Sequence, residues 1–302
     1  MQNLIYKKKK MKKSTKLFLI LMMFVPFLIG VGYDFFMKIE TVRLMFSDQY
    51  GTGFGLYWIN LAFQELCDPN SYLLSSIIMI FKVFFVFNFI GVPMQLIISF
   101  FFYKKVTFTN GFRIIYYLPN LITPVITCLI FRTMFDTNIG PISAILVKAG
   151  MEIPFEGLFF SPNSAFTMIM IYTFWIGTGA STLHYTAAML RIPSELRDAI
   201  RLDGVGYTRE FIQFVIPMIS PILSVMILSN CTAGFGLYGE VLMLTNPSIS
   251  KVYTVSYLIS EGAKSGRYFE AAGRGAIVTL IAIPIVLGVR WFFGKILPDV
   301  SY

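Results

Sequence analysis

Residues 190–217 read LRIPSELRDAIRLDGVGYTREFIQFVIP, the most polar internal stretch of the chain. Ser194 is the predicted N-cap of a short helix, and Gly204 suits the left-handed position that ends such a helix. Glu195 in the first turn and Arg201 near the last turn both complement the helix dipole. The stretch therefore predicts a short polar helix between two strongly apolar segments.

The same stretch predicts an amphipathic helix-turn-helix. The apolar face of the first helix consists of Leu196, Ala199 and Ile200, and the charged residues beside it are Glu195, Arg197, Asp198 and Arg201. Thr208 is the predicted cap of the second helix. In that helix Phe211, Phe214 and Val215 form an apolar stripe at i, i+3 and i+4 spacing. Such a loop needs a surface to lie against, either the membrane interface or a groove on a partner protein.

The composition indicates a membrane protein. Of the 302 residues, 56% are hydrophobic and 14% are charged, against about 25% charged residues in an average soluble protein. The net charge of +9 does not indicate nucleic-acid binding, because seven of the 25 Lys and Arg residues lie between positions 7 and 16. Soluble, secreted and disordered classes are excluded as well. A disulfide framework, a zinc site and a His-rich site are not expected, because the three cysteines are widely spaced and His184 is the single histidine.

Six segments are long and apolar enough to cross a hydrocarbon core about 30 Å thick. They are residues 17–37, 73–103, 114–135, 165–185, a segment that follows Phe211, and residues 276–293. Prolines within several of them are tolerated where neighbouring helices or water satisfy the freed carbonyl groups. The expected fold is an all-α polytopic membrane protein. Its parts are a basic tail at 1–16, a six-helix domain at 17–298 with the polar loop at about 190–213, and a short tail at 299–302.

The distribution of basic residues predicts the orientation. With the N-terminus inside, sixteen Lys and Arg residues fall on the inner side and eight on the outer side, which places both termini in the cytoplasm. A cleaved signal peptide is the alternative for the N-terminal segment. Gly30, Val31 and Gly32 do not form an A-x-A cleavage site, so an uncleaved signal anchor is favoured.

The run from Asp198 to Pro217 resembles the EAA loop of the permease subunits of bacterial ABC importers, whose pattern is roughly E-A-A-x-x-D-G-A, then F, then a leucine-proline. The residues in register are Ala199, Asp203, Gly204, Phe211 and Pro217. The preceding residues 191–196 resemble the I-P-x-E-L lead of the carbohydrate branch. Asp198, Ile200 and Val205 depart from the usual Glu, Ala and Ala.

Three further matches extend the resemblance over about residues 17–298. They are GFGL at 53–56 followed by Asp68 and Pro69, RIIYYLP at 113–119, and LTNP at 244–247. The lysine tail and the first span are similar to those of the maltose-type first subunit. The resemblance implies a type I importer permease fold in the cytoplasmic membrane of a bacterium.

In that family the loop is a coupling helix that docks into a cleft of the ATP-binding subunit. The coupling residues implied here are Glu195, Arg197, Asp198, Ala199, Arg201, Asp203, Gly204, Phe211 and Pro217. The partners implied are a second permease subunit, two copies of an ATPase and an extracellular binding protein. The sequence has no G-x-x-x-x-G-K-[ST] phosphate loop, and Gly262–Ser265 lacks the first glycine at the required spacing. ATP and magnesium are therefore expected on the ATPase, and neither catalytic residues nor metal ligands are expected in this chain.

Polar and aromatic residues near the middle of the membrane are the candidates for sugar contacts. By resemblance, the contacts fall near Thr173, Ile176, Gly177, Ala180, Asn230, Gly234 and Leu237, with Phe235 and Tyr238 as aromatic platforms. Gly234 and Leu237 stand where the maltose member has amides, so maltose itself is not the predicted substrate. Close helix packing through the glycines is the competing interpretation of the fifth span.

The favoured function is sugar or oligosaccharide import, and three alternatives stay open. The same machinery could carry glycerol phosphate, an amino acid or a peptide. A secondary transporter would need intramembrane acids and paired repeats, which are not evident. A membrane enzyme would need a catalytic cluster in a span. Lys82, Glu240 and His184 are either functional or simply interfacial.

Overall fold

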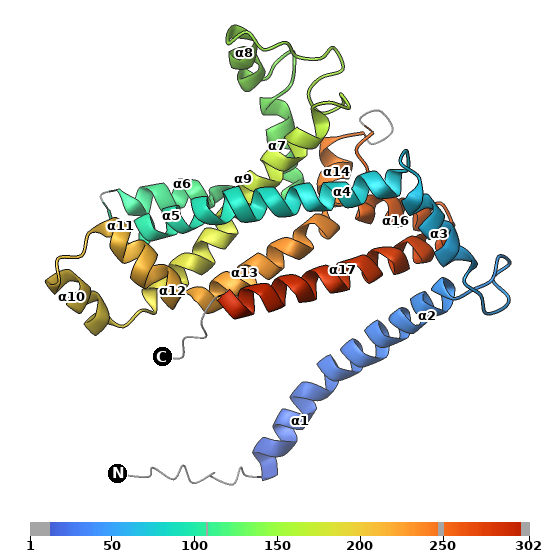
Figure 1. Ribbon diagram of the computed structural model, residues 1–302, viewed down its shortest axis with the longest axis horizontal. Helices are drawn as coiled ribbons and strands as arrows, with labels where there is room; N and C mark the ends of the chain where they lie inside the picture. The colour runs from blue at the N-terminus through green and yellow to red at the C-terminus, as the bar shows by residue number, and fades with distance from the viewer. Residues whose placement is uncertain (1–12, 107, 247–250, 297–302) are drawn as a thin grey trace.

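The computed structural model describes residues 13–106, 108–246 and 251–296, and within these ranges the chain is helical with no strand beyond one isolated bridge between Ser47 and Phe54. Four helices are long and apolar enough to cross a membrane: Lys13–Met45, Tyr72–Tyr103, Ala165–Leu190 and Tyr268–Lys295. Two bent helix pairs raise the number of candidate spans to as many as six, if each pair is one span. The expected all-α, multi-pass fold is therefore confirmed (Figure 1).

The first span is a continuous rod of α1 (Lys13–Phe27), a π-helical segment η1 (Leu28–Asp34) and α2 (Phe35–Met45). It is longer than the expected 17–37 because the charged residues after position 37 continue the helix. None of its side chains is buried, and α1 diverges from the rest of the molecule while α2 approaches α17 (Tyr268–Ile296) (Figure 1). The lysine run at 7–10 lies outside the described residues.

The second span is one continuous helix made of α4 (Tyr72–Phe85), a π-helical segment η2 (Val86–Gly91) and α5 (Val92–Tyr103). Ser71 caps it by accepting a hydrogen bond from the Leu74 amide at 3.0 Å. Its 32 residues would span roughly 48 Å at 1.5 Å per residue, so the helix extends beyond the hydrocarbon core. It therefore connects the two ends of the bundle.

The third span is broken, which corrects the expected single segment at 114–135. It consists of α6 (Thr109–Leu121) and α7 (Pro124–Met134), whose axes differ by 106°. Pro124 is the cause, because a residue before proline avoids the helical region and Thr123 accordingly has φ −61° and ψ 143°. Pro124 is visible in the sequence, but prolines are tolerated in membrane helices, so an unbroken span was expected.

The fourth span, α9 (Ala165–Leu190), is straight and packs along α5. The Ser99 hydroxyl of α5 lies 3.1 Å from the Thr182 carbonyl oxygen of α9. A buried apolar cluster continues this contact toward the polar loop. Its buried members are Val92, Leu96, Tyr103, Tyr185, Met189, Ile192, Val215, Ile219, Leu223 and Ile227.

The fifth span is also bent. It begins with α11 (Tyr207–Glu210), η3 (Phe211–Val215) and α12 (Ile216–Met218), and continues after a 76° bend as α13 (Ser220–Ala233) and η4 (Gly234–Gly236). The bend lies between Pro217 and Pro221. The sixth span, α17, is unbroken through Pro284.

Four further helices in the described ranges are short. They are α3 (Tyr57–Cys67), α8 (Pro141–Lys148), α14 (Gly239–Leu244) and α16 (Val255–Lys264), and α8 projects away from the bundle beyond α7 (Figure 1). Arg274 of α17 binds Glu65 of α3 at 2.8 Å and Glu270 of its own helix at 2.7 Å. The backbones of α3 and α17 come so close at Gly273 that a Cβ there would lie 2.5 Å from the Trp58 carbonyl oxygen.

Candidate functional site

The predicted loop helix exists as α10 (Ser194–Leu202) and projects from one end of the bundle (Figure 1). Its C-terminus ends as expected, because Gly204 has φ +64°. The Gly204 amide donates to the Arg201 carbonyl at 3.1 Å, and the Val205 amide donates to the Ile200 carbonyl at 3.3 Å. These two bonds form a Schellman motif that turns the chain back toward α11.

The predicted caps of the two loop helices are wrong. Ser194 is the first helical residue of α10, and Pro193 occupies the N-cap position without a side-chain hydrogen bond. A proline disfavours the helical conformation in the residue before it, so α10 does not extend toward the N-terminus beyond Pro193. Thr208 lies inside α11, whose N-cap is Gly206 in an extended conformation.

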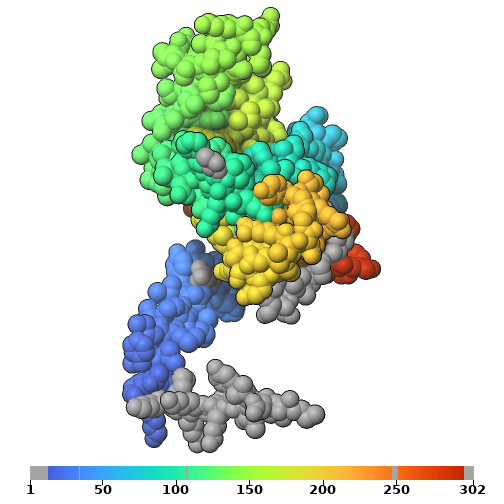
Figure 2. Space-filling model, turned by 90° about the vertical axis from the view of Figure 1, so that its left-hand side faces the viewer, coloured from blue at the N-terminus to red at the C-terminus, as the bar shows by residue number. Residues whose placement is uncertain are grey.

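The two faces of α10 differ as predicted except at Ala199 and at Arg197, which is half-buried instead of exposed with the other charged residues. Ile200 is buried and Leu196 is half-buried against the apolar cluster, whereas Ala199 is exposed and does not belong to the inner face. The exposed charged residues are Glu195, Asp198 and Arg201. Leu202, which the sequence analysis did not single out, is 89% exposed. Figure 2 views this end of the molecule, where the yellow residues near position 200 lie beside the green surface of α5 and α6.

The predicted apolar stripe of the second loop helix faces the interior of the protein. Val215 is buried, while Phe211 and Phe214 are half-buried. Phe211 packs against Phe100 of α5, with ring centroids 4.9 Å apart. Pro217 lies two residues before the bend at Ile219 and is half-buried.

An ion pair that the sequence analysis missed connects this loop to the second span. The Lys104 ammonium lies 2.5 Å from the Glu210 carboxylate, and their side chains are 14% and 5% exposed. The sequence analysis counted Lys104 only as an inner basic residue. No local sequence pattern links two positions that are 106 residues apart. Asp203, by contrast, is exposed at the C-cap of α10.

The candidate sugar residues of α9 share one side of that helix. Thr173, Ile176 and Gly177 are half-buried and Ala180 is exposed. The Thr173 hydroxyl donates to the Ile169 carbonyl at 2.7 Å. A Cβ at Gly177 would lie 3.2 Å from the Phe87 ring, so this glycine permits close approach of η2 and α9.

The candidates of the fifth span occupy two different environments. Gly234 is buried against Ile80, whose Cα would lie 3.2 Å from a Cβ at this position, and Leu237 is 4% exposed in a cluster with Val83 and Phe87. Both therefore take part in packing between α4 and the fifth span. Phe235 is half-buried beside the cluster that contains Leu73 and Ile77. The sugar-contact assignment stays a prediction for all of these residues.

Asn230 is the polar candidate with a partner across the bundle. Its Nδ2 donates to the Oδ1 of Asn88 at 3.3 Å, and the Nδ2 of Asn88 donates to the Phe84 carbonyl at 2.9 Å. Asn88 lies in η2 and was not predicted as a site residue. The sequence pattern that marks this position is a lone amide within a run of phenylalanines. In the structure the residue lies in a π-helical segment, and such segments are frequent at functional sites.

Tyr238 lies beyond the end of the fifth span and contacts α16. Lys264 donates a hydrogen bond to the Tyr238 hydroxyl, and this bond raises the pKa of Lys264.

Lys82 is exposed and lies 5.6 Å from the centroid of the Phe166 ring, and the exposed His184 ring bonds the Ala180 carbonyl at 2.8 Å. Within the described ranges no group of three His, Cys, Asp or Glu residues could hold a metal ion.

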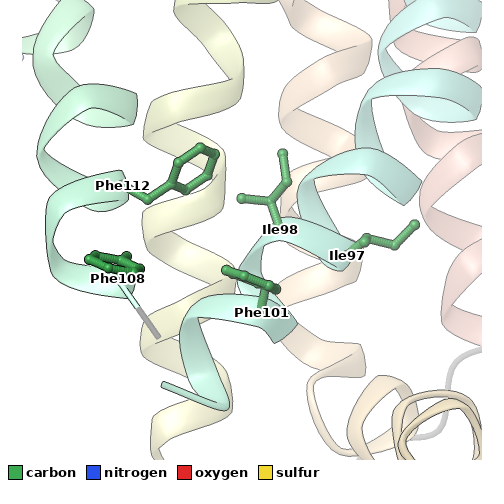
Figure 3. A pocket seen from close by; sticks show the side chains of 5 residues that line it. All are labelled: Ile97, Ile98, Phe101, Phe108 and Phe112. Carbon is green, nitrogen blue, oxygen red and sulfur yellow. The ribbon is translucent and has the colours of Figure 1, made fainter. Parts of the chain in front are cut away.

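An apolar groove lies between α5 and α6 (Figure 3). It has a volume of about 350 Å³ and is lined by Ile97, Ile98, Phe101, Phe108 and Phe112. Five hydrocarbon side chains offer a sugar no hydrogen-bond partners. The groove is therefore suited to an acyl chain or apolar side chains and is separate from the predicted sugar residues.

No protein-family model matches the chain. A probable ABC transporter permease protein of Pyrococcus horikoshii is 25% identical over 288 residues, which cover 92% of this chain and 96% of that protein. The arabinooligosaccharides transport system permease protein AraP of Bacillus subtilis is 24% identical over 203 residues, covering 65% of this chain and 62% of AraP.

The fold is also that of a solved ABC importer chain. A crystal structure of a bacterial alginate ABC transporter, in complex with a periplasmic protein that holds an alginate pentasaccharide, contains a chain that matches with a TM-score of 0.80. The match has 18% sequence identity and covers 95% of this chain and 98% of that one. These comparisons confirm the resemblance of the chain to the transmembrane permease subunits of ABC transporters.

Proposed function

We propose that this chain is the permease subunit of an ABC importer that moves a sugar or an oligosaccharide across the membrane, coupled through residues 190–213 to ATP hydrolysis on separate subunits. The observation that carries the proposal is α10. It projects from the end of a multi-pass bundle, keeps the EAA register from Asp198 to Pro217, and turns at Gly204 in the expected left-handed conformation. The exposed side of α10 combines charged residues with the apolar surface of Ala199 and Leu202, which suits a groove on a partner protein.

The coupling surface consists of the exposed side of α10 and the turn after it. Glu195, Asp198 and Arg201 present charges there, Ala199 and Leu202 present apolar contact area, and Asp203 precedes the Gly204 turn. Arg197 is half-buried and serves the inner side of the helix. Phe211 and Pro217 shape the connection to the fifth span. ATP and magnesium bind the ATPase and not this chain, which performs no covalent chemistry.

The complete transporter contains a second permease subunit, two ATPase copies and an extracellular binding protein. One six-span chain forms only half of a pathway, so a second, similar permease is implied. The alginate transporter with its periplasmic protein supports a binding-protein partner. The division into a basic tail at 1–16, a permease domain at 17–298 and a tail at 299–302 follows the apolar segments and the resemblance, which also implies a bacterial membrane. The basic-residue count supports cytoplasmic termini.

The substrate assignment rests on the sugar specificity named for AraP and for the alginate transporter. The predicted contacts are Thr173, Ile176, Gly177, Ala180, Asn230, Gly234, Phe235, Leu237 and Tyr238. Among them Asn230 has the side chain best suited to a sugar hydroxyl, because an amide both donates and accepts hydrogen bonds. A non-sugar solute carried by the same machinery is the alternative outcome.

The test is reconstitution of the chain into liposomes with its second permease, its ATPase and its binding protein. We expect ATP hydrolysis and solute uptake to rise together when a sugar-loaded binding protein is added outside. Screening oligosaccharides, glycerol phosphate and amino acids identifies the substrate. Uptake by the chain alone, without ATP, would refute the proposal.

A further inference from the structure

We infer that Lys104 and Glu210 are positioning residues that hold the coupling loop against the inner end of the second span, so that movement of α10 is passed to that helix. The inference rests on the proposed function, because it concerns how the loop acts on the spans. Neither residue belongs to the EAA register. Both were identified from the distance between Lys104 Nζ and the Glu210 carboxylate.

The ion pair is buried among aromatic rings. Lys104 Nζ lies 5.4 Å from the centroid of Phe100, 5.6 Å from Tyr103 and 5.3 Å from Tyr207. Both carboxylate oxygens of Glu210 are within 2.5 Å of the same ammonium group. Water is largely excluded from this site, so loss of one partner would leave the other charge buried and unpaired.

A second contact joins the same end of α5 to α10. Leu196 of α10 packs against the apolar cluster that contains Tyr103. The last residue of the second span and its C-cap therefore contact both helices of the loop, with Tyr103 beside α10 and Lys104 beside α11. This arrangement fixes the angle between the loop helices and the span.

The second span can transmit a movement over a long distance because it is unbroken. The third and fifth spans bend by 106° and 76°, whereas Tyr72–Tyr103 has no such break. Asn88 lies 16 residues before Lys104 in this helix, or about 24 Å along its axis. Asn88 accepts the hydrogen bond from Asn230. Lys104 and Asn88, the hydrogen-bond partner of the candidate sugar residue Asn230, thus belong to one continuous element.

The test compares charge variants in the reconstituted transporter. Lys104→Met and Glu210→Gln are expected to lower the stimulation of ATP hydrolysis by loaded binding protein at least tenfold, while basal hydrolysis and recovery of the ATPase with the permease stay within twofold of wild type. The exchanged pair, Lys104→Glu with Glu210→Lys, is expected to regain at least a third of the stimulation. Lys105→Met, at the adjacent exposed lysine, is the matched control and is expected to have no effect.

Three results would count against the inference. Stimulation within twofold of wild type in both single variants would overturn it. Loss of the ATPase from every variant, including the conservative Lys104→Arg, would overturn it in favour of a purely structural pair. If the wild-type transporter shows no stimulation while Lys105→Met is equally inactive, the proposed function itself fails, and the inference fails with it.

Discussion

Gly204 is the position where a single substitution tests the coupling loop most directly. Its φ is +64°, and no other heavy atom lies within 4 Å of a Cβ built there, so backbone conformation and not space is the constraint. Proline locks φ near −65° and has no amide hydrogen, so Gly204→Pro removes both the left-handed turn and the 3.1 Å bond to the Arg201 carbonyl. The native turn then costs about 3 kcal/mol or more, which lowers its population roughly 100-fold.

We expect this variant to insert into the membrane normally, because Gly204 lies outside every candidate span. ATP hydrolysis stimulated by loaded binding protein is expected to be abolished. Gly204→Asn is the matched control, since asparagine tolerates the left-handed region, and it is expected to retain most of the stimulation. Gly204→Ala should fall between the two, with a strain of about 1–2 kcal/mol. Full stimulation in Gly204→Pro would show that the turn has no part in coupling.

Three further perturbations test other parts of the structure. Asn230→Leu should change the affinity for transported solute without releasing the ATPase, and an unaltered uptake profile would assign this residue to packing. Gly273→Ala should destabilise the protein by about 1–3 kcal/mol, measured as a lower unfolding temperature in detergent, because its Cβ would lie 2.5 Å from the Trp58 carbonyl oxygen. Hydrogen bonds from the backbone, first that of Gly53, lower the pKa of Asp48. The ionised carboxylate therefore stabilises the 47–54 loop. This stabilisation is complete above the unfolded-state pKa of about 3.9 and is lost as pH falls through the lower folded-state pKa. Proteolysis of the loop should therefore increase on acidification, and Asp48→Asn should abolish that pH dependence.

The spans and the loop could be predicted because their signals are local. Apolar length places a helix in the membrane, and the spacing from Asp198 to Pro217 identifies the loop. The caps at Pro193 and Gly206 were missed because Ser and Thr are the usual capping residues, whereas here backbone conformation alone sets both boundaries. The break before Pro124 was missed because prolines also occur inside unbroken membrane helices. Length and composition do not reveal whether a proline kinks a helix or divides it.

The long-range pairs could not be predicted from one sequence. Lys104 and Glu210 are 106 positions apart, and Asn88 and Asn230 are 142 positions apart. Each residue taken alone has an ordinary local explanation. Lys104 is one of several basic residues predicted to lie on the inner side, and Asn88 is one amide in an aromatic run. Only the packing of α5 against α11, and of η2 against α13, brings each pair together.

The proposed coupling residues and the predicted sugar residues differ in how much of a complete transporter each would require. The coupling loop is defined within this chain, since α10, its turn and the ion pair behind it are complete in one subunit. The sugar candidates are incomplete by comparison: Ala180 is exposed, Asn230 is half-buried, and Leu237 is enclosed in its own chain's core. In a heterodimer the second permease would supply the opposite wall of the pathway. Substrate specificity should therefore change with the partner permease, whereas the effects of Lys104 and Glu210 variants should be the same with any partner that supports transport.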